Sequence, residues 1–286
     1  MKNLQILLST YNGEKFLREQ LDSFTRLDNF ENVKVLIRDD GSSDSTREIL
    51  LEYRDKYGFE IHFGENLGLN RSMYELIKMR DTSCEYFSFS DQDDVWLPYK
   101  LSRAVERLSE YDGELTLYAS CSSLTDENLN VTGRLIIPKK KLSFLNAMIE
   151  NVCAGHSQVC NKTFMDILAD NFSDSIVVFD HWVYLSASDI FCLPSFSEGF
   201  PTCVIEACVC KAFIITTFRG DAKEIVKNRD YGIILKDNEE GPLYDALVSV
   251  LDEPEYRQRA VELCYDVVKN NYTWKNTADN LLLLLQ

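Results

Sequence analysis

Ser90-Asp91-Gln92-Asp93-Asp94-Val95-Trp96 directly follows the apolar run Tyr86-Phe87-Ser88-Phe89. The apolar run predicts a buried strand, so the three acids are expected at its carboxyl end, where open α/β sheets bind their ligands. Carboxylates this close repel one another unless a cation offsets the cost. Oxygen ligands of this kind suit Mg²⁺ or Mn²⁺ held together with substrate phosphates. The alternative is a solvated acidic turn in which Asp93 or Asp94 caps the next helix.

Two earlier apolar runs, 4–8 and 33–37, also end in polar residues. The first is followed by Thr10, Tyr11 and Asn12, and the second by Asp39-Asp40-Gly41-Ser42. Taken singly, the second group is a turn before a helix capped by Ser43 or Asp44. Because parallel strands bring their carboxyl ends to one edge, the three polar groups together predict a cradle for a nucleoside diphosphate.

Within this cradle the polar residues have separate expected roles. Asp40 can accept a hydrogen bond from a pyrimidine N3–H, and the backbone near Thr10, Tyr11 and Asn12 can flank the base and ribose. Asp91 can reach the ribose. Asp93 can hold a divalent metal across the two phosphates, which neutralises the diphosphate as it leaves.

The spacing of apolar residues over the first ninety positions alternates between strand and helix signals. Strands are expected at 4–8, 33–37, 60–63 and 86–89, with a helix after each of the first three. This order predicts an α/β fold with a mostly parallel sheet and right-handed crossovers. A helix over 97–111, a strand over 115–120 and helices over 143–150 and 162–171 are also expected, whereas 176–185 fits a strand or a helix.

The chain changes character near residue 186, where a second and smaller α/β segment begins. Strands are expected at 189–193, 212–217 and 231–235, a helix near Pro201, and mostly helix from Leu243 onward. The predicted domains are therefore 1–185, which binds the nucleotide sugar, and 186–286.

The bulk properties describe an ordinary soluble protein of 286 residues that carries a formal net charge of −16. So negative a chain is not expected to bind nucleic acid, and we expect at most a peripheral association with a membrane. No signal peptide or spanning segment is expected, and the nine scattered cysteines suggest reduced thiols. These features predict a cytoplasmic protein, with the inner face of the membrane as a possible location.

Three segments together resemble glycosyltransferase family two, in its branch of rhamnosyltransferases and other polysaccharide-building enzymes. They are residues 9–17, 39–46 and 89–96, and the resemblance covers about 1–185. It implies an A-type Rossmann-like fold, Mg²⁺ or Mn²⁺, and transfer with inversion from a UDP- or dTDP-sugar to a saccharide or lipid-linked acceptor in surface polysaccharide synthesis. It also implies Asp40 at the base, Asp91 near the ribose and Asp93 on the metal.

The resemblance extends to two further segments. Inversion by direct displacement needs a general base within reach of the acceptor hydroxyl, and Asp180 in Asp180-His181-Trp182 occupies the position of that base in similar proteins. The alternative for Asp180 is a helix N-cap. Ala154-Gly155-His156-Ser157 resembles the loop that lines the donor sugar and acceptor, which points to Gly155 and His156.

The segment from 186 to about 275 resembles the carboxyl-terminal, B-type domain of glycosyltransferase family four. Glu198 and Glu206 match glutamates that contact the donor in that family, whose products usually retain configuration. The domain is partial, because the basic pair and the amino-terminal acceptor domain of similar proteins have no counterpart here. The chain therefore has the character of a natural fusion or a built chimera, in which Glu198 and Glu206 are interpreted as a relic or scaffold.

Three other functions remain open at this stage. The first is a retaining family-four-like transferase that uses Glu198 and Glu206. The second is a degenerate, non-enzymatic protein that binds a nucleotide or a partner. The third is a sugar nucleotidyltransferase, which the lack of a Gly-rich loop with an Arg/Lys pair near the amino terminus disfavours.

Overall fold

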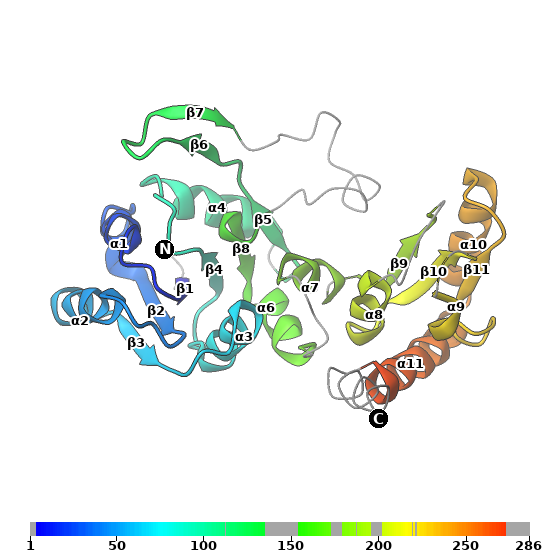
Figure 1. Cartoon of the computed structure of the whole chain (residues 1–286). Coiled ribbons are helices and arrows are strands. Elements are labelled where there is room, and N and C mark those ends of the chain that lie inside the picture. The colour runs from blue at the N-terminus through cyan, green and yellow to red at the C-terminus, as the bar shows by residue number, and fades with distance from the viewer. Residues whose placement is uncertain are drawn as a thin grey trace, which may run out of the picture. The chain divides into compact units, whose positions relative to one another are not determined.

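The fold was analysed in a computed structural model that describes residues 4–111, 113–134, 154–172, 179–186, 188–195, 202–218, 220 and 222–272. Its contacts divide the chain into two compact units, Met1–Ala169 and Asp170–Gln286. Figure 1 labels the elements of both units, each of which is considered by itself. The expected helix over 143–150 lies outside the described residues.

A six-stranded sheet in the order β3-β2-β1-β4-β8-β5 forms the centre of the first unit. The strands that come first in the chain are β1 (Leu4–Thr10), β2 (Val33–Asp39), β3 (Glu60–Phe63) and β4 (Tyr86–Ser90). All neighbouring pairs among these four are parallel, which confirms the predicted mostly parallel α/β fold. Thr10 pairs with Asp39 and Leu8 with Ser90, so the polar residues that follow three of these strands emerge at one edge.

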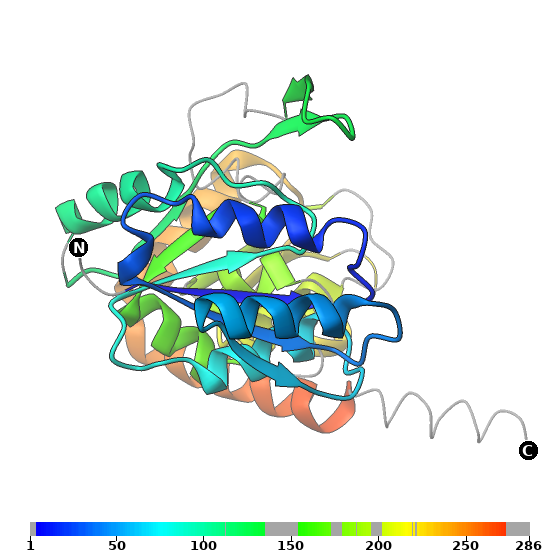
Figure 2. The same ribbon diagram turned by 90° about the vertical axis from the view of Figure 1, so that its left-hand side faces the viewer.

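Helices cover both faces of this sheet. They are α1 (Leu17–Thr25), α2 (Thr46–Tyr57), α3 (Leu69–Met79), α4 (Lys100–Leu108) and α6 (Lys162–Asp170). Apolar residues of α1, α2 and α4 form one core cluster with β1 and β2, and Figure 2 shows α1 and α2 side by side across that face. The α3 helix contacts β1 and β2 and supplies Met73, Leu76 and Ile77 to the buried interior.

Two short strands complete the sheet on the other side of β4. β8 (Gln158–Asn161) is antiparallel to both β4 and β5 (Leu117–Ala119). Between them the chain forms a hairpin, β6 (Ser123–Thr125) and β7 (Val131–Arg134), which projects away from the sheet (Figure 1). The sequence pattern indicated neither this hairpin nor β8.

The second unit contains a parallel sheet in the order β11-β10-β9. Its elements are α7 (Phe179–Ser186), β9 (Ile190–Leu193), α8 (Thr202–Val209), β10 (Phe213–Thr217), α9 (Ala222–Ile225), β11 (Ile233–Leu235), α10 (Glu240–Asp252) and α11 (Pro254–Asn271). The ambiguous segment 176–185 thus includes the helix α7. Since α7 packs against α8, the contacts divide the chain at Ala169 rather than near 186.

Within the described residues, none of the helices combines the length and the apolar character needed to span a bilayer. The eight cysteines in this part of the chain are free thiols, and most of them are buried.

Substitution of Phe24 tests the packing of α1 against the core of the first unit. It is fully buried, and its centroid lies 4.8 Å from that of Trp96 in an edge-to-face contact. We expect Phe24→Ala to lower the free energy of unfolding of the first unit by about 3–5 kcal/mol, because the lost side chain leaves a cavity. Urea denaturation followed by far-UV circular dichroism measures the change.

Phe16 provides the matched control, since it is also a phenylalanine next to α1 but is 37% exposed. Phe16→Ala should change the free energy of unfolding by about 0.5 kcal/mol or less. Equal losses in the two variants would contradict this packing.

Candidate active site

The loop after β4 is tied to the end of β1 by the side chain of Gln92. Its Oε1 accepts hydrogen bonds from Thr10 Oγ1 at 2.6 Å and from the Tyr11 amide at 2.9 Å. Its Nε2 donates to the Tyr11 carbonyl at 3.2 Å. Gly13 leaves room for this amide, because a Cβ there would lie 2.6 Å from Oε1. Gln92 therefore fixes the backbone that carries the exposed ring of Tyr11.

The loops after β1 and β2 are joined by a second set of hydrogen bonds. Asn12 has a left-handed backbone conformation with φ 48°, and its amide donates to Ser42 Oγ at 2.9 Å. The amide of Ser43 donates in return to Asn12 Oδ1 at 2.8 Å, while the Gly13 amide donates to Thr46 Oγ1. Hydrogen bonds thus link the polar residues that follow β1, β2 and β4. We call this set, Thr10, Tyr11, Asn12, Ser42, Ser43 and Gln92, the polar framework.

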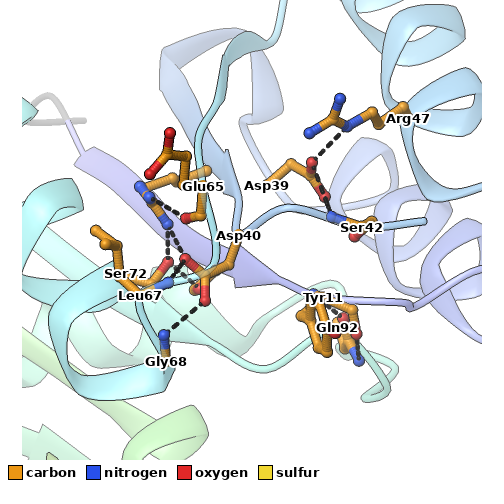
Figure 3. A network of polar contacts seen from close by, with 12 residues as sticks. Tyr11, Asp39, Asp40, Ser42, Arg47, Glu65, Leu67, Gly68, Ser72 and Gln92 are labelled. Atoms are coloured by element: carbon orange, nitrogen blue, oxygen red, sulfur yellow. Dashed lines mark hydrogen bonds and ion pairs between the residues drawn. The ribbon is translucent and has the colours of Figure 1, made fainter.

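Asp40 lies at the centre of a buried polar network (Figure 3). Its Oδ1 accepts from the Leu67 amide at 2.9 Å and is ion-paired with Arg38, while its Oδ2 accepts from the Gly68 amide at 2.9 Å. The two amides belong to the turn that leads into α3. Asp40 therefore connects the end of β2 to the start of α3.

The neighbouring Asp39 is fully buried and has a different set of partners. It accepts from the Ser42 amide at 3.3 Å and from Arg47 Nε at 2.8 Å. Gly41, two residues further along the chain, has φ +82°, and a Cβ there would lie 2.9 Å from the amide nitrogen of Asn66. The turn after β2 and the segment before α3 are therefore in close backbone contact.

A group of possible metal ligands lies just beyond the end of β4. Asp91, Asp94 and His156 each offer one ligand atom, and these three atoms lie within 4.8 Å of one another. His156 Nδ1 is 3.5 Å from Asp91 Oδ2 and 3.9 Å from Asp94 Oδ2. The Asp94 oxygen is buried and has no hydrogen-bond partner among the described residues. An unsatisfied buried carboxylate oxygen beside an imidazole nitrogen fits the donor set of a divalent cation.

His156 reaches this position because β8 returns antiparallel to β4. Ser88 pairs with Val159, so the short 3₁₀ turn Gly155–Ser157 that precedes β8 lies beside the residues that follow β4. His156 Nε2 lies 2.8 Å from Ser122 Oγ. A hydrogen bond of this kind would orient a metal-binding imidazole and leave Nδ1 for the metal.

Lys100, the first residue of α4, is half-buried and packs against the same group. Its Nζ donates to the His156 carbonyl at 2.6 Å and lies 3.9 Å from the centroid of the Trp96 ring. Burial lowers the pKa of Lys100 to about 8, against the opposing effect of Asp94 and Asp91. Burial also raises the pKa of Asp94, and the hydrogen bond to Asp91 raises that of His156.

The acidic segment is not a helix cap, because α4 begins only at Lys100 with Tyr99 as its N-cap. The capping alternative for Asp93 or Asp94 was therefore wrong. Asp93 is exposed and lies outside the group of possible ligands, although the sequence favoured it as the metal ligand. Its role stays a prediction.

No role was expected for Gln92, Arg38 or Lys100, and Asp94 was expected only as part of the acidic segment or as a helix cap. The signals were present but indirect. Gln92 and Asp94 stand within that segment, and Lys100 follows it, whereas the position of Arg38 within an apolar strand is the clue to its burial.

The remaining predicted site residues belong to the second unit. Asp180 is the second residue of α7, which is not the N-cap position, and neither its side chain nor that of His181 is described. Glu198 lies outside the described residues, and Glu206 is buried in α8. The roles proposed for these residues from the sequence stay predictions.

Family models match both parts of the chain. The model described as Glycosyl transferase family 2 matches residues 5–168. The chain belongs to this family. A second model, Glycosyl transferases group 1, matches residues 174–265, the part compared above with another transferase family. The resemblance stated from the sequence is therefore confirmed.

Curated relatives carry related names. A dTDP-rhamnosyl transferase, RfbG of Shigella flexneri, is 34% identical over 106 residues, which are 35% of this chain and 36% of that protein. An uncharacterised glycosyltransferase of Rickettsia typhi is 31% identical over 111 residues, or 39% of this chain and 33% of that protein. The chain thus spans roughly a third of the length of these relatives.

Solved structures share the fold. S. aureus TarS 1-349 in complex with UDP-GlcNAc matches with a TM-score of 0.51 and 20% identity, over 64% of this chain and 53% of that one. The same protein in complex with UDP matches with a TM-score of 0.52 and 19% identity, over 65% and 54%. The likeness shows an A-type glycosyltransferase fold, as expected.

Removal of the Gln92 side chain tests the polar framework. Gln92→Ala leaves the Tyr11 amide without its acceptor, which we expect to cost about 1–3 kcal/mol locally. Hydrogen exchange at the Tyr11 amide should accelerate by about tenfold or more. Gln258→Ala on the exposed surface of α11 is the control, and an unchanged exchange rate at Tyr11 in Gln92→Ala would contradict the assignment.

Proposed function

We propose that the chain is a metal-dependent glycosyltransferase that binds a UDP- or dTDP-sugar at the carboxyl edge of the first sheet. The grouping of Asp91, Asp94 and His156 carries this proposal, together with a buried Asp94 oxygen that accepts no hydrogen bond from the described residues. The framework around Tyr11 and Asp40 supports it, because these loops border the same edge. TarS, which shares the fold, was solved with UDP-GlcNAc, and RfbG is named for a dTDP-linked rhamnose.

The ligand atoms favour one metal over another. Two carboxylates with one imidazole suit Mn²⁺, whereas Mg²⁺ prefers oxygen ligands alone. A divalent cation here would neutralise charge on the departing diphosphate. We assign Asp91 also to the ribose side and retain the exposed Asp93 as a further ligand, required when nucleotide is present.

Asp180 is the proposed general base, which would take the proton of the acceptor hydroxyl during displacement with inversion. The support is its place before His181 and Trp182 in a sequence that resembles family two. We propose a saccharide or lipid-linked acceptor, with Gly155 and His156 beside the donor sugar. The peripheral, inner-face location at a membrane is part of the same proposal.

Binding of Mn²⁺ separates the roles of the acids. By electron paramagnetic resonance, Asp94→Asn and His156→Ala should each weaken Mn²⁺ binding by about tenfold or more without nucleotide, since each removes a ligand. Asp93→Asn should weaken it only when dTDP or UDP is present. Asp55→Asn, which alters an exposed carboxylate, is the control.

Two results would overturn this assignment. One is Mn²⁺ binding that survives intact in Asp94→Asn and His156→Ala. The other is tight binding of UDP and dTDP in calorimetry with EDTA present.

The proposed base has a separate signature. Asp180→Asn should leave the affinity for Mn²⁺ and dTDP unchanged while sugar transfer falls by about a hundredfold or more, because only proton transfer is lost. Transfer from a dTDP- or UDP-sugar to a saccharide acceptor measures this, with anomeric configuration read by nuclear magnetic resonance. A fully active Asp180→Asn, or a product with retained configuration, would contradict the proposal.

A further inference from the structure

Arg38 is a buried cation in β2 that has no part in the proposed metal site. It is only 5% exposed, although it follows the apolar residues Val35, Leu36 and Ile37 in the strand. Its Nη1 is ion-paired with Asp40 and donates to Ser72 Oγ at 2.8 Å, and its Nη2 donates to the Glu65 carbonyl at 2.9 Å. One guanidinium thus connects β2, the segment before α3 and α3 itself.

The chain leaves a specific space for this guanidinium at Gly64. A Cβ at Gly64 would lie 2.8 Å from Arg38 Cζ, and closer still to Nη2. The amide of Gly64 is itself held by the Asp39 carbonyl at 2.9 Å. Because backbone conformation does not require glycine here, the close approach of Arg38 accounts for it.

Arg38 restricts how the Asp40 carboxylate can accept further hydrogen bonds. Arg38 and the Leu67 amide occupy Oδ1, whereas the described residues give Oδ2 a single donor, the Gly68 amide. A carboxylate oxygen can accept two hydrogen bonds. Oδ2 therefore keeps one acceptor position, on a carboxylate that cannot turn without breaking three contacts.

A fixed acceptor distinguishes nucleobases by chemistry. Uracil and thymine present an N3–H to it, whereas cytosine presents an unprotonated N3, which leaves two acceptors facing each other. A site built to accept a hydrogen bond rejects an analogue without the donor, because a buried polar group then lacks its partner.

We propose that Arg38 is a positioning residue that sets the base preference of the donor site, by locking Asp40 and the segment 64–68 in one arrangement. This inference rests on the proposed function, in which Asp40 faces the base. In this proposal the guanidinium acts through Asp40 and not by direct contact with the donor. It acts by compensating the buried carboxylate and by removing its freedom to rotate.

The test compares the affinities of UDP, dTDP and CDP by calorimetry with Mn²⁺ present. The wild-type protein should bind UDP and dTDP about tenfold or more tightly than CDP, which is the effect of one charge-assisted hydrogen bond. In Gly64→Ala and Arg38→Lys the ratio of UDP to CDP affinity should fall to within about threefold. The affinity for pyrophosphate with Mn²⁺ should stay unchanged, since it does not involve the base.

Matched controls add the same chemical change elsewhere. Gly241→Ala places a methyl group in open space, and Arg54→Lys alters an exposed arginine. Both should preserve the ratio. Circular dichroism shows whether each variant folds. If Gly64→Ala and Arg38→Lys do not fold, the same affinities are compared in Ser72→Ala, the mildest variant, which removes one partner of Arg38.

The outcomes separate this inference from the proposed function. A wild-type protein that binds none of these nucleotides with Mn²⁺ overturns the proposed function. A wild-type protein that binds UDP and CDP equally, or folded variants that keep the wild-type ratio, overturn the role of Arg38 and leave the proposed function standing.

Discussion

The antiparallel pairing of β8 with β4 is the constraint on which the candidate metal site depends. The parallel strands deliver polar residues to one edge, but of the three possible metal ligands they place only Asp91 and Asp94 there. Because β8 runs the other way, its amino-terminal end meets the carboxyl end of β4 and brings His156 within 3.5 Å of Asp91. The third possible ligand, His156, thus comes from a segment more than sixty residues after Asp91 and Asp94 in the sequence.

Electrostatics explains why such a group needs a cation. The chain carries a net charge of −16, and the proposed donor is itself an anion. Two carboxylates at the same edge would repel a diphosphate. Lys100 does not offset this repulsion fully, because its ammonium already donates to the His156 carbonyl. A divalent ion bound here would reverse the local sign, so this charge balance supports the metal dependence that we propose.

The sequence predicted the elements whose signals are local. The runs at 4–8, 33–37, 60–63 and 86–89 correspond to β1 to β4. The signal is strongest for β1, β2 and β4, because these largely buried strands are rich in apolar residues and are followed by polar turns. β8 was missed because it is only four residues long and includes the buried polar Gln158. For the same reason His156 could be named only by resemblance, whereas its grouping with Asp94 depends on long-range strand pairing.

Arg38 shows a different limit, in which burial depends on chemistry that a hydropathy pattern does not carry. An arginine after three buried apolar residues would be expected to mark the solvent-exposed end of a strand. It is buried because Asp40, Ser72 and the Glu65 carbonyl together satisfy its donors, and because Gly64 leaves space for it. Burying an ion pair is a poor way to gain stability, since desolvation offsets much of the attraction. Its position at the edge where we propose that the donor binds is better explained as a means of fixing the orientation of the Asp40 carboxylate. In the same way, the hydrogen bonds of Gln92 to the backbone of Tyr11 fix the loop after β1.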